Sequence, residues 1–539
     1  MGVAAASCSR RDAAPTQAND RGGGVFEIED STLAARIGSV RRRSGLLAVL
    51  TLLGGVFALY FPALRLELTG DDYQWVQLAH SALHQPRLLL ADLDTFYRPA
   101  STWTLLGDRI LWGHRAAGFH ATNLALHAIV SSLLFAVALR LGVGRVGSFA
   151  ISMIWLASPF TDEPAISVAI RFEDLLIVSW LALILAWPRE REEWTRGRVL
   201  SVCAVVLFAM ASKETWVVTP AIIAALELFV HRVGGRGLVK SVGLSALAAL
   251  IYTCAYFLSF PGTKSYFVQS PAVLAKIPHE LAAFLDFEGL VPLGFSLDWR
   301  QILAIAVVVL AATYAFRSSP GATACGVALL VLPSLPTLLV PYLPSRYTAA
   351  PYAGFLLLGA ATLSRLDSDL PLKLRRGFRA IVMIAATLTL LAGIVTVRGD
   401  LADAKRVADA HWRLLVEASA VVNRLPAGVP ILVARAESES PLATVAGTLR
   451  GLPKLLFPRH EDAYALADTA ALFEWTLGRE DAFFRSEDAS GVAGSRGIVL
   501  VHRAGGFDWP PVAVTDVGRV AATLRTNGTP FRIIRRVTD

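Results

Sequence analysis

Acidic and basic side chains recur beside the long apolar runs of this sequence, starting with a pair of aspartates. Asp71 and Asp72 stand side by side in LELTGDDYQWV, directly after the first apolar run. Two clustered carboxyls raise the pKa of one of them, which can then accept a proton from a hydroxyl. The same TGDD sequence is also typical of a helix N-terminus. The pair alone therefore leaves two interpretations open, a general base at the membrane surface and a solvated cap.

Further charged residues stand at the ends of later apolar runs. They are Asp162, Glu163, Arg171, Glu173, Asp174, Lys213, Glu214 and Arg346. Charges at membrane depth are costly and usually functional. Arg and Lys side chains that converge at one face would hold an anionic headgroup such as a lipid phosphate. The alternative is a set of ion pairs that ties helix ends together, for example between Arg171 and Glu173 or Asp174.

One apolar run carries polar residues at helical spacing. His120, Asn123 and His127 fall at i, i+3 and i+7, on one face of the expected helix. Such a face indicates an interhelical hydrogen-bond stripe rather than a metal site, because the nearest carboxylates are far away in the sequence. The four cysteines form no CxxC pair, so we expect no zinc site, no other metal and no disulfide.

The composition places these residues in a membrane protein. Hydrophobic residues make up 54% of the 539 residues and charged residues 17%, against about 25% charged in soluble domains. This excludes a disordered chain and an ordinary cytosolic enzyme. The net charge of +8 does not indicate nucleic-acid binding, since Lys and Arg are roughly threefold denser in alternate loops, as the positive-inside rule predicts for cytoplasmic loops. The N-terminus is then cytoplasmic.

We predict an α-helical polytopic membrane protein with three regions. Residues 1–45 form a disordered cytoplasmic tail, and 46–397 contain about eleven transmembrane helices with a long outer loop at 65–118. The aromatic residues of that loop favour helices in the interface plane. Residues 398–539 form a small extracytoplasmic α/β domain. Its expected elements are strands at 430–435, 497–504 and 531–537 and a helix at 461–480.

Several motifs occur together in a recognisable order. They are DD after the first run, FYRP, GFHxxNLxLHA, SPxxxEP, SKET and RY followed by P and GF. Over about residues 60–365 the chain resembles the polytopic GT-C glycosyltransferases. It is most similar to the branch with the membrane O-mannosyltransferases that carry TPR repeats and their bacterial relatives. The resemblance implies a GT-C fold and a polyprenyl-phosphate sugar donor. It also implies inversion at the anomeric carbon and a site on the non-cytoplasmic face.

The resemblance also assigns residues. It implies that Asp71 is the catalytic carboxyl with Asp72 beside it, and that no metal or other cofactor is required. Substrate-binding positions carried over from the family are Arg98, His120, Glu163, Arg171, Lys213, Glu214 and Arg346. The predicted location is a bacterial inner membrane.

The chain departs from the family pattern in two places. The TPR repeats are absent, and the SRYTAAPYAG stretch lacks the usual Tyr-Leu-Tyr-Leu-Pro run. These departures leave the acceptor open among a glycan, a lipid, a protein and a cell-wall polymer. Two other functions also stay open: a lipid-linked saccharide transporter, which usually shows repeated halves and a mid-membrane site, and a non-catalytic scaffold of envelope glycan assembly.

Overall fold

The computed structural model describes most of the helical region and parts of the C-terminal region. The described residues are 45–69, 72–90, 96–187, 195–230, 236–259, 276–285, 299–337, 345–422, 424–426, 428–435, 483–487, 489–503, 506–507, 510–526 and 531–537. The predicted tail at 1–45, apart from residue 45, and the predicted helix at 461–480 lie outside them. Met1–Thr51 and Leu52–Asp539 form two compact units, and the elements below belong to the second, apart from residues 45–51 of the first helix.

Short helices connect the first apolar segment to the bundle. The helix at 45–60 continues into the 3-10 turn η1 (Phe61–Arg65), and the outer loop then folds into α2 (Asp72–Ala82), η2 (Pro86–Leu90) and α3 (Pro99–Trp112). The described part of the predicted outer loop thus contains helices, as its aromatic pattern indicates. Trp103, Ile110 and Leu111 of α3 are exposed, which suits a helix in the interface plane.

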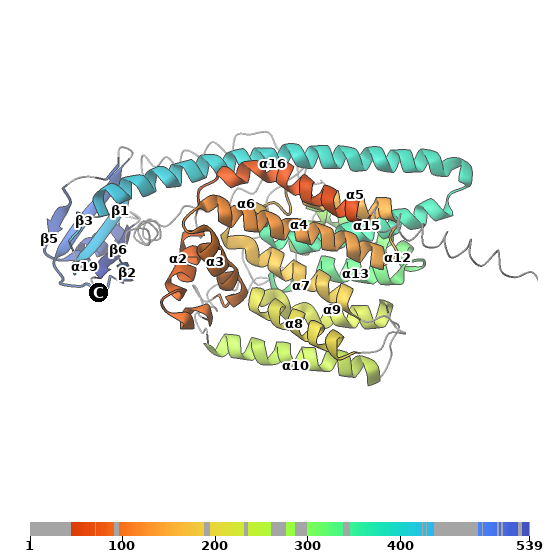
Figure 1. Cartoon of the computed structure of the whole chain (residues 1–539), viewed down its shortest axis with the longest axis horizontal. Helices are drawn as coiled ribbons and strands as arrows, with labels where there is room; N and C mark the ends of the chain where they lie inside the picture. Colours follow the sequence, from red (N-terminus) through yellow and green to blue (C-terminus); the bar gives the residue numbers. More distant parts are fainter. Residues whose placement is uncertain are drawn as a thin grey trace, which may run out of the picture. The chain divides into compact units, whose positions relative to one another are not determined.

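The bundle itself consists of helices, several of which lie side by side in Figure 1. They are α4 (Ala116–Arg140), α5 (Arg145–Leu156), α6 (Glu163–Ile166), η3 (Ala169–Arg171), α7 (Phe172–Ala186), α8 (Arg196–Ser212), η4 (Glu214–Val218), α9 (Thr219–Ala225), η5 (Leu226–Val230), α10 (Arg236–Ser259), α11 (Lys276–Phe284), α12 (Trp299–Phe316), α13 (Pro320–Val331), α14 (Ser334–Thr337), η9 (Ser345–Tyr347), α15 (Ala349–Asp369) and α16 (Leu372–Val422).

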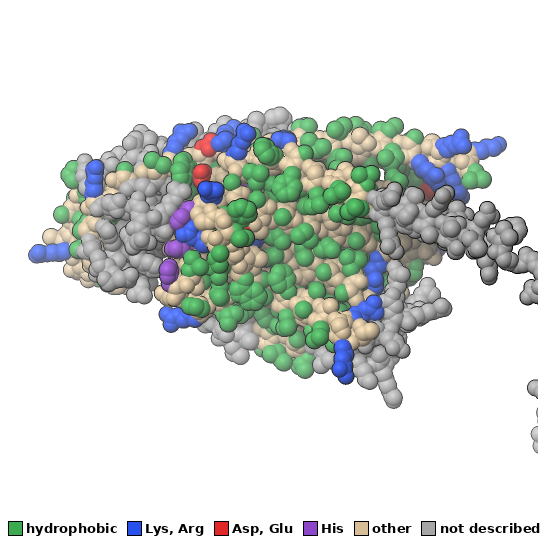
Figure 2. All heavy atoms as spheres, viewed as in Figure 1, with side chains coloured by type: hydrophobic (Ala, Val, Ile, Leu, Met, Phe, Trp, Pro, Cys, Tyr) green, Lys and Arg blue, Asp and Glu red, His purple; other side chains and the backbone are tan. Residues whose placement is uncertain are grey.

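Large apolar side chains fill the bundle. Trp155, Trp180 and Trp216 are fully buried in one hydrophobic core. Helices α13 and α15 cross where Gly326 meets Gly354, and a Cβ on Gly354 would overlap the backbone of α13. Outward-facing side chains are also apolar: Figure 2 shows green side chains over much of one face, with Lys and Arg toward its margins. Such a surface is expected of a protein whose solvent is lipid.

The number of membrane spans stays a prediction. Within the described residues, three helices are long and apolar enough to cross a membrane by length and composition: Gly45–Arg65, Ala116–Arg140 and Leu372–Asp409. Four shorter apolar helices occur at Arg145–Leu156, Ser245–Cys254, Ile302–Phe316 and Pro320–Pro336. The chain is therefore an apolar helical protein with several candidate spans, and about eleven remains the count that the sequence predicts.

Helix α16 is unbroken across the predicted domain boundary at 397–398 (Figure 1). Residues change from apolar to charged there, but no Pro or Gly pair interrupts the helix. Asp400 and Asp403, just past the boundary, are both buried. The change from apolar to charged residues at 397–398 therefore lies within a single helix and is not the end of one.

A mixed sheet follows α16. Its strands are β1 (Pro430–Arg435), β2 (Phe483–Glu487), β3 (Gly497–Arg503), β4 (Gly506–Phe507), β5 (Val512–Val514) and β6 (Phe531–Val537). The order is β2-β6-β1-β3-β4, with β5 on β3. Strands β1 and β3 are parallel, and the other pairs are antiparallel. Helix α19 (Val517–Thr526) packs Val517 and Ala521 against Leu432 and Ile533. All three predicted strands are present, and the side of the membrane stays a prediction.

Candidate functional site

Six charged residues that are far apart in the sequence lie together in three ion pairs. We call Arg98, Glu163, Glu173, Lys213, Glu214 and Arg346 the charged cluster. They come from the N-terminus of α3, from α6, from the first turn of α7, from the α8–η4 junction and from η9. The predicted convergence of Lys and Arg is thus present, and each cation already has a carboxylate partner.

Arg98 is held more firmly than the other cations. Pro99 begins α3 immediately after it, a position that suits Pro. The Nε and Nη2 atoms of Arg98 donate to the two carboxylate oxygens of Glu214, each at 2.9 Å. Its guanidinium lies 3.8 Å from the Phe172 ring centroid and 4.3 Å from that of Phe96. Burial lowers the pKa of Arg98, but Glu214, together with Tyr347 and Glu173, raises it, so that the pKa lies above its usual value.

Lys213 and Glu173 form the most deeply buried pair of the cluster. The Lys213 Nζ contacts Glu173 Oε1, and the same ammonium lies 4.4 Å from the centroid of the Tyr347 ring. The two residues belong to predicted outer segments, before and after the apolar parts of α7 and α8. Burial raises the pKa of Glu173, and Lys213 opposes this shift. Burial likewise lowers the pKa of Lys213, and Glu173 opposes that.

Arg346 and Glu163 form the third pair. Glu163 Oε1 accepts a hydrogen bond from Arg346 Nη1 at 2.9 Å, and Oε2 accepts one from the Arg346 backbone N–H at 2.7 Å. The side chain of Arg346 is 20% exposed, whereas that of Glu163 is 1% exposed. Arg346 is therefore the cation of the cluster that an outside ligand reaches most easily.

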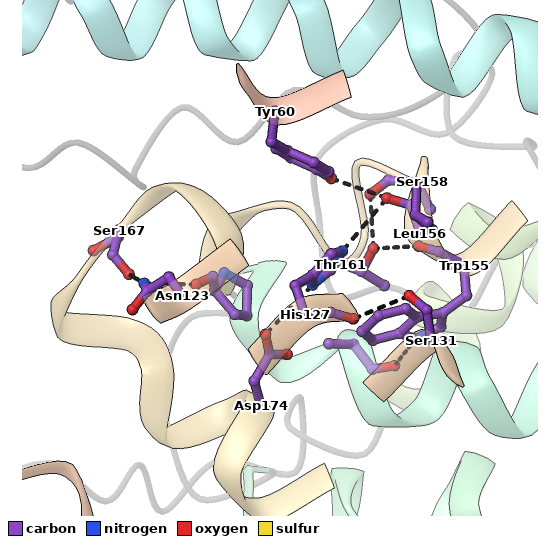
Figure 3. Close-up of polar contacts among 12 residues, drawn as sticks. Tyr60, Asn123, His127, Ser131, Trp155, Leu156, Ser158, Thr161, Ser167 and Asp174 are labelled. Atoms are coloured by element: carbon purple, nitrogen blue, oxygen red, sulfur yellow. Dashed lines mark hydrogen bonds and ion pairs between the residues drawn. The ribbon is translucent and has the colours of Figure 1, made fainter. Parts of the chain in front are cut away.

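The segment that carries Glu163 is irregular, and side chains from neighbouring helices satisfy its backbone. Asn123 of α4 donates to the carbonyl oxygens of Pro164 and Ser167 at 2.9 and 2.7 Å. Thr161 donates to the Trp155 carbonyl, and Tyr60 donates to that of Leu156 at 3.1 Å (Figure 3). Buried backbone groups without partners are costly. Asn123 thus positions the turn that presents Glu163.

Asp72 fastens the start of α2 to this same segment. Its Oδ1 accepts hydrogen bonds from Ser167 Oγ at 3.1 Å and from the Ala169 N–H at 2.6 Å, and its Oδ2 accepts one from the Thr69 N–H at 3.0 Å. Asp72 is 1% exposed. Asp72 is therefore a buried anchor and not a solvated cap, and its catalytic role stays a prediction. Asp71 lies outside the described residues, and its role also stays a prediction.

Arg171 lies in a separate buried pair. Its Nη1 is 2.7 Å from Asp108 Oδ2, and its Nη2 donates to the Phe119 carbonyl at 3.2 Å. Burial raises the pKa of Asp108, and Arg171 opposes this shift. The partner is thus neither Glu173 nor Asp174, and Arg171 is fully buried. These contacts favour the ion-pair alternative, and a role of Arg171 in substrate binding stays an untested prediction.

The polar face of α4 makes contacts between helices (Figure 3). His127 Nδ1 lies 3.4 Å from Asp174 Oδ2 of α7, and its ring stacks on Trp155 at 4.6 Å between centroids. His120 is buried on the same helix. In the part of the chain that the structure describes, no three His, Cys, Asp or Glu residues are grouped to hold a metal.

Two buried carboxyls near the charged segments were not predicted from the sequence. Asp108 stands in an ordinary-looking GDR of α3, and Asp400 stands beyond the predicted boundary. Asp400 is hydrogen-bonded to Asp162. Burial, followed by the charge of Asp400, raises the pKa of Asp162 well above its usual value. Two buried carboxyls in contact share a proton, so this pair links α16 to the segment that carries Glu163.

Comparison with known proteins decides the fold. No family model matches the sequence, and no curated protein sequence matches it. Among solved structures, ArnT from Cupriavidus metallidurans in the apo state aligns over 90% of this chain and 97% of its own, with a TM-score of 0.51 and 14% identity. The chain has a GT-C fold.

A GT-C fold is what the sequence motifs predict. A second structure of the same ArnT, bound to undecaprenyl phosphate, aligns over 81% of this chain and 78% of its own, with a TM-score of 0.43 and 14% identity. At this level of identity the likeness establishes the architecture alone. Reaction and substrates must be argued from the residues.

Proposed function

We propose that this protein is a membrane glycosyltransferase that moves a sugar from a polyprenyl-phosphate donor to an acceptor hydroxyl, with inversion, at the non-cytoplasmic face. The charged cluster is the observation that carries the proposal. Three cations meet at one end of helices in a GT-C fold, and Arg346 is partly exposed there. A lipid phosphate is the anion that such a site can meet at a membrane surface. The ArnT structure with undecaprenyl phosphate supports a donor of this kind.

The residues suggest a single displacement. Asp71 takes the proton of the acceptor hydroxyl, whose oxygen forms a bond to the anomeric carbon. The bond from that carbon to the phosphate oxygen breaks, and the electron pair leaves with the phosphate beside Arg346 and Lys213. One displacement inverts the anomeric centre. Positioning and charge stabilisation supply most of the rate. Asp72 accepts hydrogen bonds from Ser167 and Ala169 and so ties the start of α2 to the segment of Glu163.

Mass spectrometry of envelope glycans and glycolipids tests the proposal. Cells that lack the gene should lose one sugar residue from one glycan or lipid, and the missing unit identifies both sugar and acceptor. Sealed vesicles containing the protein should modify an impermeant acceptor only when it is added on the non-cytoplasmic side. An unchanged envelope composition would contradict the enzyme and favour a scaffold. Accumulation of an unmoved lipid-linked saccharide would favour a transporter.

Replacing Arg346 by Ala should weaken donor binding by about 1.5–3 kcal/mol, the range for a hydrogen bond to a charged group. Lys at this position should restore only part of the affinity, because an ammonium lacks the planar fork of the guanidinium. Binding of a polyprenyl-phosphate sugar to purified variants in lipid measures the effect. Arg379→Ala is a matched control, since Arg379 pairs with Asp367 on an exposed surface. Normal donor affinity with lowered stability would show that Arg346 is purely structural.

A further inference from the structure

The charged cluster is electrically neutral as it stands. Arg98, Lys213 and Arg346 supply three positive charges, and Glu163, Glu173 and Glu214 supply three negative charges when ionised. A phosphate brings at least one further negative charge into this group. Because buried charges require compensation, either a cation must leave its carboxylate or the cluster must gain a proton.

The three cations differ in how freely they can turn to a phosphate. Arg98 is fixed by two hydrogen bonds to Glu214 and by two aromatic rings. Arg346 is partly exposed; its Nη1 donates to Glu163, and its guanidinium lies 5.6 Å from the Tyr347 ring centroid. Lys213 donates to Glu173 through one ammonium on a flexible stem, and this ammonium lies 4.4 Å from the Tyr347 ring centroid and 5.7 Å from that of Phe172. Arg346 and Lys213 are therefore the cations that can reach a phosphate.

The three carboxylates differ in the hydrogen bonds that they keep when Lys213 and Arg346 turn away. Glu214 keeps both bonds from Arg98, and Glu163 keeps the hydrogen bond from the Arg346 backbone N–H. Glu173 has Lys213 as its hydrogen-bond partner in the described residues, and its side chain is only 6% exposed. A buried carboxylate that loses its cation becomes neutral by binding a proton.

We propose that a polyprenyl phosphate bound at Lys213 and Arg346 is accompanied by uptake of one proton on Glu173. The inference rests on the proposed function, because it takes the phosphate of that lipid as the anion. Glu173 thereby acts as a positioning residue: it holds Lys213 in the free protein and releases it, neutralised, to the phosphate. No bond to the lipid changes in this step, and the proton comes from solvent.

Other charged groups around Glu173 also influence how strongly it binds a proton when the phosphate is present. Arg98 and Arg346 also favour its ionised form, and Arg346 turns toward the phosphate with Lys213. Glu163 and Glu214 oppose the ionised form by like charge, as does the bound phosphate itself. Arg98 alone stays in place as a cation. The balance thus shifts toward protonation when the phosphate binds.

Proton uptake determines how the affinity for polyprenyl phosphate changes with pH. The pKa of Glu173 is higher in the phosphate complex than in the free protein, so that affinity is greatest below the free-state pKa. Affinity then falls as pH rises between the two pKa values, by up to about tenfold per pH unit for one proton. Above both pKa values it becomes independent of pH again, at its weakest.

Titration calorimetry of the full-length protein in nanodiscs tests the inference, with undecaprenyl phosphate as the probe. Titrations near pH 7.5 in buffers of different ionisation enthalpy give the number of protons taken up. We expect uptake approaching one proton beyond that of the phosphate itself, whose second pKa is about 6. Infrared difference spectra should show a new protonated carboxyl band on binding.

Glu173→Gln carries the decisive comparison, because the amide mimics the protonated carboxyl. This variant should show neither the extra proton nor the new band, and its affinity should be about tenfold or more above wild type at the alkaline end of the range. Glu227→Gln is the matched control, since Glu227 is buried elsewhere against Trp187; it should behave like wild type. Thermal unfolding of each variant establishes that it is folded.

The outcomes separate the inference from the proposed function. Binding without proton uptake, or uptake that persists in Glu173→Gln, overturns the inference and leaves the glycosyltransferase proposal intact. Proton-coupled binding in a protein that transfers no sugar supports the inference and overturns the enzyme. A folded protein that binds no undecaprenyl phosphate overturns both. Inorganic phosphate should not compete at millimolar concentration, and equal affinity for it would overturn the assignment to a lipid.

Discussion

Replacing Asp71 by Asn should give a protein that folds, inserts and binds its lipid donor but transfers almost no sugar. Asn keeps the size and hydrogen-bonding shape of Asp and cannot accept the proton of the acceptor hydroxyl. Loss of a positioned general base typically costs about 10²–10⁴-fold in rate. Single-turnover transfer by the purified variant in lipid measures the loss, and donor binding measured in parallel should be unchanged.

Asp72→Asn is the matched neighbour for this test, and its defect should be one of folding. Asp72 is buried and accepts hydrogen bonds from Thr69, Ser167 and Ala169. In this variant the amide NH₂ would replace one carboxylate oxygen and would face N–H or O–H groups that are themselves donors. A buried polar group left without a partner in this way costs about 1–3 kcal/mol. The stability of Asp72→Asn should therefore fall more than that of Asp71→Asn. Near-normal turnover of Asp71→Asn with a strong rate loss in folded Asp72→Asn would reassign the base to Asp72.

Replacing Arg171 by Ala should lower the free energy of unfolding by about 3–5 kcal/mol, the cost of breaking a buried ion pair. The change leaves Asp108 buried without its cation and frees the carbonyl of Phe119. Chemical or thermal unfolding in detergent or lipid measures the loss. The exposed pair of Arg379 and Asp367 is the control, where Ala should leave the stability nearly unchanged because solvent screens the pair.

The pH dependence of Arg171→Ala follows from Asp108. Burial already raises the pKa of this carboxyl, and Arg171 is the group that opposes the shift most. Without Arg171 the folded-state pKa rises further above the unfolded value. The folded variant then binds the proton more tightly than the unfolded chain. Its stability deficit should shrink as pH falls through the folded-state pKa and be largest above it. A stable variant with weakened donor binding would instead assign Arg171 to the lipid phosphate.

Local patterns in the sequence determined much of the architecture. Apolar runs and loop charges indicated a helical membrane protein, and the aromatic mixture after the first run predicted the helices α2 and α3. Strand-like runs predicted strands at 430–435, 497–504 and 531–537, and the structure has β1, β3 and β6 there, with β3 ending at Arg503. The motifs indicated a GT-C fold, which the ArnT structure confirms at the level of architecture. Periodicity and short motifs are local properties, so a single sequence carries them.

Only the tertiary structure decided which charges meet. Arg171 has two acids close by in the sequence, Glu173 and Asp174, yet it pairs with Asp108 of another helix. Arg171 ends the short turn η3, whereas Glu173 and Asp174 lie in the first turn of α7, and packing brings Asp108 of α3 to the guanidinium instead. Glu163 likewise meets Arg346, which follows it by 183 positions. Burial then decides the chemistry, because a charge removed from water is stable only beside the partner that the fold supplies.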